Sequence, residues 1–233
     1  MRPRSLWRHE VRRAGWAALL TPPVTAVLVA VIAIAQAASG AGTTDVARTL
    51  QSVLEMGMPL AAGIGAATLI GRDPVVELQL AVPSSYPVTL LRRWVATLSW
   101  VAAIALLTSA ALVATGWWAR WPQSHDVLLG QLTWLSPAAW LAAVGFLAAA
   151  LLASPAAASG VVAIIWLFEQ VLKDDIAAQH WSRLLFLFTT TRGAVPADWL
   201  PNRLLLLGTG LVVLAVAAAR LRRTERFLVG VSG

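Results

Sequence analysis

Cysteine is absent from the 233-residue sequence, and charged residues make up only 12% of it. Without thiols the chain has no disulfide framework, no thiolate metal site and no cysteine nucleophile. A soluble globular domain carries about 25% charged residues. The shortage of charge, together with 58% hydrophobic residues and a mean hydropathy of +0.72, indicates an integral membrane protein.

Lysine occurs once, at Lys173, and Asp174 follows it. A P-loop needs a glycine-rich turn followed by Lys and then Ser or Thr, because the lysine reaches the phosphates and the hydroxyl holds magnesium. Serine-hydrolase and zinc-protease motifs are also missing, and His9, His125 and His180 are far apart in the sequence. We therefore expect no nucleotide, metal or catalytic site formed by a local motif, which leaves only a triad assembled in space.

Six apolar runs predict an all-α integral membrane protein whose residues 1–233 form a single transmembrane domain. A signal peptide is the alternative for the first run, but that run is longer than the roughly 7–15 residues of a signal-peptide core. The predicted spans are approximately 16–38, 50–70, 94–118, 134–153, 156–172 and 204–219.

Two further segments are predicted to lie at the membrane surface. Residues 5–16 alternate aromatic, apolar and basic residues with helical spacing, as in an amphipathic interfacial helix. Residues 181–191 are apolar but reach only about half the ~20 residues of a crossing helix. We interpret them as a short re-entrant or interfacial helical segment before the last span.

Basic residues predict the orientation of the chain. With six spans, twelve Lys and Arg residues fall on the side of both termini and six on the other side. Basic loops stay in the cytoplasm, so both termini are expected there, with the protein multi-pass in the inner (plasma) membrane. The net charge of +7 is therefore explained by basic residues that set the orientation of the chain and contact membrane lipids. No nucleic-acid partner is expected.

Ionisable residues within spans are candidate functional residues by default. Glu55 and Glu169 are the two cases here, although a helix-end ion pair of Glu169 with Lys173, worth about 0.2–0.5 kcal/mol, explains the second equally well. Trp166 is deep enough to line a cavity or to face lipid. The set of candidate pathway or gate residues is Glu55, Trp166, Glu169, Phe186 and Phe188.

Small residues in the second span favour close helix packing over a substrate path. They recur with helical spacing, which lets another helix approach closely. The positions are Gly57, Ala61, Ala62, Gly65 and Ala66.

A charged segment bounded by prolines separates the second and third spans. It carries Asp73, then Glu77-Leu78-Gln79-Leu80-Ala81-Val82-Pro83-Ser84, and ends before Arg92-Arg93. This pattern resembles the loop between spans two and three of the type 2 ABC exporter permeases, in which an acidic stretch leads into Leu-x-Leu-x-x-x-Pro-Ser and a basic start to span three. The six-span layout and the amphipathic N-terminal segment are similar as well.

The resemblance implies a transmembrane subunit that exports a hydrophobic or amphipathic substrate such as a drug, lipid or peptide. It implies two separate ABC ATPase subunits, which hold the ATP and magnesium, and a second permease subunit, identical or homologous. The segment after span two would be a cytoplasmic coupling helix docked on the ATPase. The coupling residues by this resemblance are Asp73, Glu77, Leu78, Leu80, Pro83 and Ser84.

Two other classes of function stay open. One is a membrane-embedded enzyme that uses Glu55, the Asp174-Asp175 pair or His180, and the other is a structural or sensory membrane partner. No paired carboxylate or histidine motif supports the enzyme. An adjacent reading frame that encodes an ATPase would favour transport.

Overall fold

The computed structural model describes residues 15–70, 86–193 and 195–230, and within these ranges the regular structure is entirely helical. The predicted amphipathic helix and the coupling residues Asp73 to Ser84 lie outside the described residues. The long helices are α2 (Gly15–Ala38), α6 (Tyr86–Ala114), α8 (Leu132–Leu152), α9 (Pro155–Val171) and α12 (Trp199–Gly230). A further helical run comprises α3 (Thr43–Ser52), the π turn η1 (Val53–Gly57) and α4 (Met58–Ala67).

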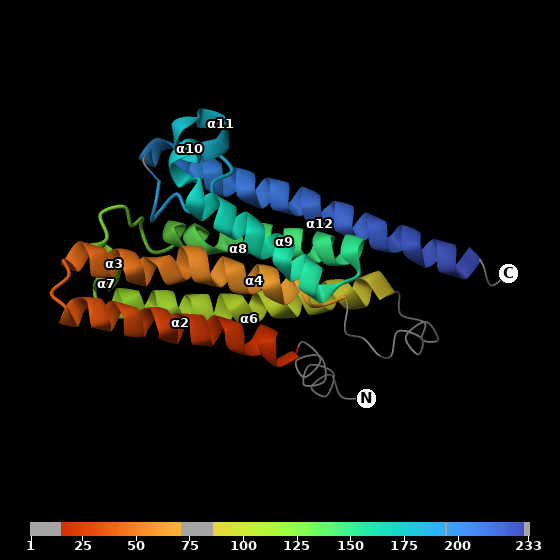
Figure 1. Cartoon of the computed structure of the whole chain (residues 1–233), viewed down its shortest axis with the longest axis horizontal. Helices are drawn as coiled ribbons and strands as arrows, with labels where there is room; N and C mark the ends of the chain where they lie inside the picture. Colours follow the sequence, from red (N-terminus) through yellow and green to blue (C-terminus); the bar gives the residue numbers. More distant parts are fainter. Residues whose placement is uncertain (1–14, 71–85, 194, 231–233) are drawn as a thin grey trace.

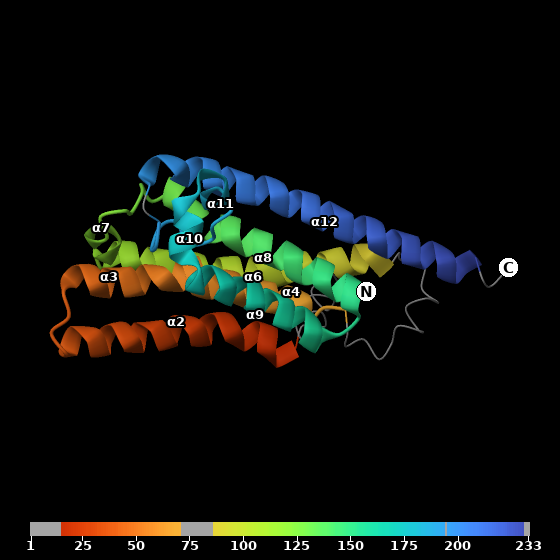
Figure 2. The ribbon, with the colours of Figure 1, turned by 45° about the horizontal axis from the view of Figure 1, so that its top comes forward.

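The helices form an elongated bundle with two different ends (Figure 1). At one end lie the start of α2, the end of α4, the start of α6 and the end of α12. At the other end lie α3 and three short helices, namely α7 (Trp117–Arg120), α10 (Lys173–Ala178) and α11 (His180–Arg183). Figure 2 shows α10 and α11 beside the start of α12. We call this second end the capped end.

Four helical stretches in the described part of the chain are long and apolar enough to cross a membrane. They are Ala18–Ala38, Val88–Ala114, Leu129–Leu152 and Pro196–Arg222. The fifth predicted span corresponds to α9, a shorter apolar helix of 17 residues. The second predicted span corresponds to the run from α3 to α4, which begins at Thr43 instead of near Leu50 because Asp45 and its neighbours already form the first turn of α3.

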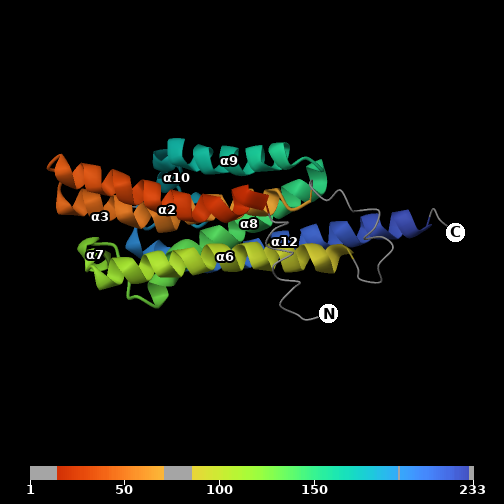
Figure 3. The same ribbon diagram turned by 90° about the horizontal axis from the view of Figure 1, so that it is seen from below.

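Helices α4 and α8 form the centre of the bundle, and Figure 3 shows α9 and α6 on opposite sides of it. The backbones of α4 and α8 meet at two glycines, because a Cβ added to Gly145 would lie 2.3 Å from the carbonyl oxygen of Gly63. Of the predicted small residues, the four in α4 (Ala61, Ala62, Gly65 and Ala66) are buried and Gly57 is partly buried, and Gly65 packs against Thr97 of α6. Helices in lipid have no hydrophobic driving force for association, so the close packing that small residues allow holds these helices together.

The segment before α12 is less helical than the sequence predicts. Only His180–Arg183 is helical there, and residues 184–192 form turns that bury Phe186, Leu187 and Phe188. The backbone leaves the helix because its polar groups bond to side chains of the surrounding helices, as described below. We call residues 184–192 the inserted segment.

The contact of Gly145 with Gly63 predicts a sharp cost for one added methyl group. Gly145→Ala would push the two backbones apart, and such overpacking costs about 1–3 kcal/mol. Gly160→Ala in α9 is the matched control, because a Cβ there meets nothing within 4 Å and alanine favours a helix by about 0.5–1 kcal/mol. Unfolding of the purified variants in mixed micelles measures both, and equal stabilities would contradict the close approach of α4 and α8.

Candidate functional site

The site begins with a break in the regular helix at η1. The backbone N–H of Met58 bonds to the carbonyl of Val53, five residues earlier, where an α-helix would bond four residues back. Pro59 has no N–H, so the carbonyl of Glu55 has no α-helical partner and the wider turn is favoured. Glu55 lies inside this turn, with none of its surface exposed. Single π turns of this kind occur frequently at functional sites.

The carboxylate of Glu55 accepts four hydrogen bonds. Oε1 accepts from the backbone N–H of Thr190, at 2.6 Å, and from Nη2 of Arg203. Oε2 accepts from the backbone N–H and the hydroxyl of Thr191, both at 2.6 Å. Hydrogen bonds to an ionised acceptor are about twice as strong as neutral ones. Glu55 therefore fixes two consecutive peptide groups of the inserted segment.

Arg203 lies in the second turn of α12 and is the positive member of the charge pair with Glu55. Its side chain is fully buried, and Glu55 is its ion-pair partner. Nη1 donates to the carbonyl of Leu187 at 3.0 Å, and Nη2 donates to the hydroxyl of Thr190 at 3.0 Å. Because desolvating either charge alone costs several kcal/mol, each residue requires the other at this depth.

Further side chains satisfy the rest of the inserted backbone. Nδ2 of Asn202 donates to the carbonyls of Arg183 and Phe186, at 2.9 and 2.8 Å. Oε2 of Glu169 accepts from the backbone N–H of Leu187 at 2.7 Å. Non-helical backbone in an apolar environment needs such partners, because water is not there to supply them.

The helix-end pair of Glu169 with Lys173 is not among the ion pairs of the described residues. Helix α9 ends at Val171, and Leu172 has non-helical dihedral angles (φ −95°, ψ 22°). Lys173 therefore starts a new helix and no longer lies one turn above Glu169. The carboxylate bonds to the inserted segment instead.

An apolar cluster anchors the same segment. The rings of Phe186 and Phe188 meet edge to face with centroids 5.6 Å apart, and Trp166 and Phe188 do so at 5.9 Å. The indole N–H of Trp166 donates to the carbonyl of Met56, in η1, at 3.1 Å. The packing partners of this cluster include Leu141, Val162 and Leu206.

Aromatic residues of the capped end surround Thr190. The indole of Trp121 donates to its carbonyl at 3.1 Å, and the indole of Trp199 donates to its hydroxyl at 2.9 Å. His125 stacks on Trp199 with ring centroids 3.6 Å apart. Burial first, and then the charge of Arg203, hold the pKa of His125 below its usual value.

The five residues that the sequence suggested as pathway or gate residues all lie at this one place. Glu55 and Glu169 bond directly to the inserted segment, Trp166 packs on it, and Phe186 and Phe188 belong to it. Sequence reasoning missed Arg203 and Asn202, because the last span was predicted to begin only at residue 204. The available signal was the pair Asn-Arg at the start of a long apolar run, where a charge is costly without a partner.

The other suggested polar residues lie elsewhere. Asp174 and Asp175 occupy the first turn of α10 and are exposed. His180 lies 3.7 Å from Asp198, which also pairs with Arg183 at 2.9 Å. Across the described ranges, no group of three or more His, Asp and Glu residues is placed to hold a metal ion.

No protein-family model, curated protein or solved structure matches this chain.

The charge pair predicts strongly coupled mutations. Glu55→Gln leaves Arg203 buried without a counter-charge, and Arg203→Gln does the reverse, so each is expected to lower the free energy of unfolding by about 3–5 kcal/mol. The double variant removes both charges and should cost clearly less than the sum of the two single variants. Chemical denaturation in micelles measures this cycle.

The exposed pair Asp45 and Arg48, 3.9 Å apart, provides the control for this cycle. Asp45→Asn and Arg48→Gln should each change stability by less than about 1 kcal/mol, since exposed pairs contribute little. Additive effects at Glu55 and Arg203 would show that the two charges do not depend on each other.

His125 predicts a loss of stability in mild acid. Its pKa in the folded protein is lower than in the unfolded chain, where it is about 6.5. Below about pH 6.5 the unfolded chain therefore binds more protons, and stability falls until the folded-state pKa is reached. Above that range the contribution is fully present. The charged groups that act on His125 are Arg203, Asp126 and Glu55.

His125→Phe keeps a ring against Trp199 and removes the titration. Melting temperatures of this variant should depend less on pH between about 7.5 and 5 than those of the unchanged chain. His180→Gln is measured in parallel because His180 is a second histidine of the capped end and lies 3.7 Å from Asp198. A His125→Phe profile identical to that of the unchanged chain would contradict the lowered pKa.

Proposed function

We propose that this chain is the transmembrane subunit of an ATP-driven exporter for a hydrophobic or amphipathic substrate. The observation that carries the proposal is the acidic, proline-bounded segment Asp73 to Ser84 ahead of Arg92-Arg93, which resembles the coupling segment of type 2 ABC exporter permeases. The arrangement of the helices supports it, because α4 and α6, which flank this segment, reach the same end of the bundle as the start of α2 and the end of α12. That end would face the cytoplasm and the ATPase subunits.

Six spans fit this proposal. The helical run Thr43 to Ala67 has 25 residues, and at 1.5 Å per residue it is about 37 Å long, more than the ~30 Å of the hydrocarbon core. Its hydropathy is lowered by Gln51 and Glu55, which are both buried in protein. The 17 residues of α9 are at the lower limit for a crossing helix. Both termini would then be cytoplasmic, as the basic residues indicate.

The inserted segment would form the outer gate of the pathway. It lies at the capped end, opposite the proposed ATPase side, and it is held by Glu55, Glu169 and Arg203. Because both oxygens of Glu55 bond to it, release of the segment would require breaking several charge-assisted bonds together. A gate of this kind would alternate between this held arrangement and a released one.

The proposal assigns the other components to partners. ATP and magnesium bind to two separate ATPase subunits, and a second permease subunit, identical or homologous, completes the pathway. The enzyme alternative lacks support at the residues suggested for it, because Glu55 is occupied by four donors and Asp174-Asp175 lie exposed in a short helix. A carboxylate so occupied acts in structure more readily than in proton transfer.

Charge reversal in the coupling segment tests the proposal. Glu77→Arg should reduce ATPase subunit retained on purification, or substrate-stimulated ATP hydrolysis, while the protein still inserts normally. The reason is that a hydrogen-bonded charge at an interface costs about 2–5 kcal/mol when its partner is stranded. Leu80→Asp should act in the same way through the apolar part of the contact.

Asp175→Arg is the matched control, because it reverses an exposed charge at the capped end. It should leave ATPase retention and hydrolysis unchanged. If Glu77→Arg and Leu80→Asp also leave both unchanged, the segment is an ordinary surface loop and the exporter assignment is lost. A structural or sensory membrane partner is then the better assignment.

A further inference from the structure

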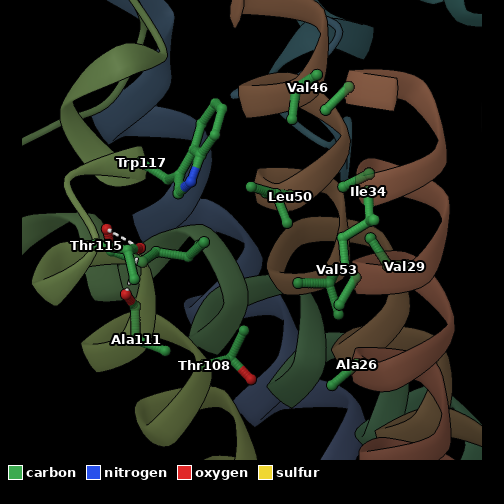
Figure 4. A pocket seen from close by; sticks show the side chains of 14 residues that line it. Ala26, Val29, Ile34, Val46, Leu50, Val53, Thr108, Ala111, Thr115 and Trp117 are labelled. Carbon is green, nitrogen blue, oxygen red and sulfur yellow. Dashed lines mark hydrogen bonds between the residues drawn. The ribbon is translucent and has the colours of Figure 1, made fainter. Parts of the chain in front are cut away.

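An apolar crevice lies between α2, α3 and α6, and Val53 of η1 is one of its lining residues. It has a volume of about 400 Å³, within the range of roughly 300–1,000 Å³ of small-molecule sites. Figure 4 shows Thr115 and Trp117 on one side of it and Leu50 and Val53 on the other. Its walls come from α2, from α3 with η1, and from the last turns of α6 with α7. None of the gate residues described above lines it.

Along α2, α3 and η1 the walls of the crevice consist of apolar side chains, and the one side-chain nitrogen in the lining is the indole N–H of Trp117. The hydroxyls of Thr108 and Thr115 donate to the carbonyls of Ile104 and Ala111 in their own helix, at 2.8 and 2.7 Å. The α2 wall is built largely from alanines, whose short side chains leave the space unfilled. The part of an occupant that lies between α2, α3 and η1 must therefore be apolar.

The crevice is long and runs along the helices. Its α2 wall extends from Ala26 to Ala37, which at 1.5 Å per residue is about 16 Å. This length is about half of the ~30 Å hydrocarbon core. The acyl chain of a lipid in one leaflet therefore has about the same length and the same orientation as the crevice.

A cation lies at the end of the crevice that is closed by Trp117. The guanidinium of Arg120 stacks over the Trp117 ring, with Cζ 4.2 Å from the ring centroid. Arg48 stacks in the same way on Trp121, at 5.1 Å, but Asp45 lies 3.9 Å from it and offsets its charge. Arg120 is therefore the main cation at this end, and guanidinium groups bind phosphate oxygens with two parallel hydrogen bonds.

We propose that the crevice is a binding site for an anionic phospholipid, with one acyl chain between α2, α3 and α6 and the phosphate at Arg120. Two independent features support this occupant over a helix or a peptide. The interior is almost entirely apolar and about one leaflet long, and the main cation, Arg120, stands at the Trp117 end, where a phospholipid lying in the crevice would place its phosphate. The site does not depend on the proposed transport function.

The test uses the full chain in lipid nanodiscs with two photoactivatable probes that share the same acyl chains, a phosphatidylglycerol and a phosphatidylcholine. We expect the phosphatidylglycerol to crosslink preferentially to lining residues of α2 and α6. Ala30→Phe fills the crevice and should lower this crosslinking by roughly tenfold or more, the scale on which apolar pockets discriminate by size. Val27→Phe adds the same ring on the exposed side of α2 and should have no effect.

The head-group contact is tested separately. Arg120→Gln should abolish the preference for phosphatidylglycerol and keep the crosslinks to the lining residues. Arg192→Gln, which removes another exposed arginine, should keep the preference. If Ala30→Phe fails to run as a single species on gel filtration, Ala111→Phe fills the crevice from α6 and takes its place.

Three results would overturn the proposal. One is equal crosslinking of both probes to the unchanged chain, and another is crosslinking that survives both filling variants. The third is a loss of chain-to-chain association in Ala30→Phe with lipid crosslinking intact, which would assign the crevice to a second copy of the chain.

Discussion

The buried ion pair of Glu55 and Arg203 is the interaction on which the capped end depends. Neither charge is stable at this depth without the other, so the pair fixes η1 against the start of α12. It also supplies the acceptors and donors that a non-helical peptide segment needs in apolar surroundings. The charges and the irregular backbone thus compensate for each other: removing the inserted segment would strand donors on Arg203 and acceptors on Glu55, and removing the charges would strand peptide groups.

Close packing of α4 on α8 decides where this pair lies. Gly63 and Gly145 let the two backbones touch, and Gly57 in η1 faces Thr25 of α2 so closely that a Cβ there would lie 2.5 Å from its methyl group. Gly57 thus lets η1 lie close to α2, and Gly63 and Gly145 let the adjoining helix α4 lie close to α8. Because Pro59 favours the wider π turn at the same position, Glu55 is presented to the inserted segment and not to lipid.

The sequence was sufficient to predict the apolar helices, because the length and hydropathy of each apolar run can be read from that run alone. It also singled out Glu55, since a carboxylate in an apolar run requires an explanation. It could not identify Arg203 as the partner of Glu55, because the two residues are 148 positions apart in the sequence. It also could not show that Lys173 begins a new helix after a one-residue break, which leaves Glu169 free to bond to Leu187. The inserted segment was recognised as too short to cross, but its turns depend on partners from α9 and α12, and local propensity contains nothing about them.

The connection between the two ends of the bundle follows from this arrangement. Helix α4 ends at Ala67 at one end of the bundle, makes the glycine contact with α8, and adjoins at its other end the π turn η1, which contains Glu55. Packed interiors have low compressibility and transmit strain, so a displacement of α4 along its axis would act on Glu55. The carboxylate there accepts four hydrogen bonds, three of them from the inserted segment. Under the proposed function, a movement of α4 at one end would therefore act on the inserted segment at the other through Glu55, as a gate driven from a distance requires.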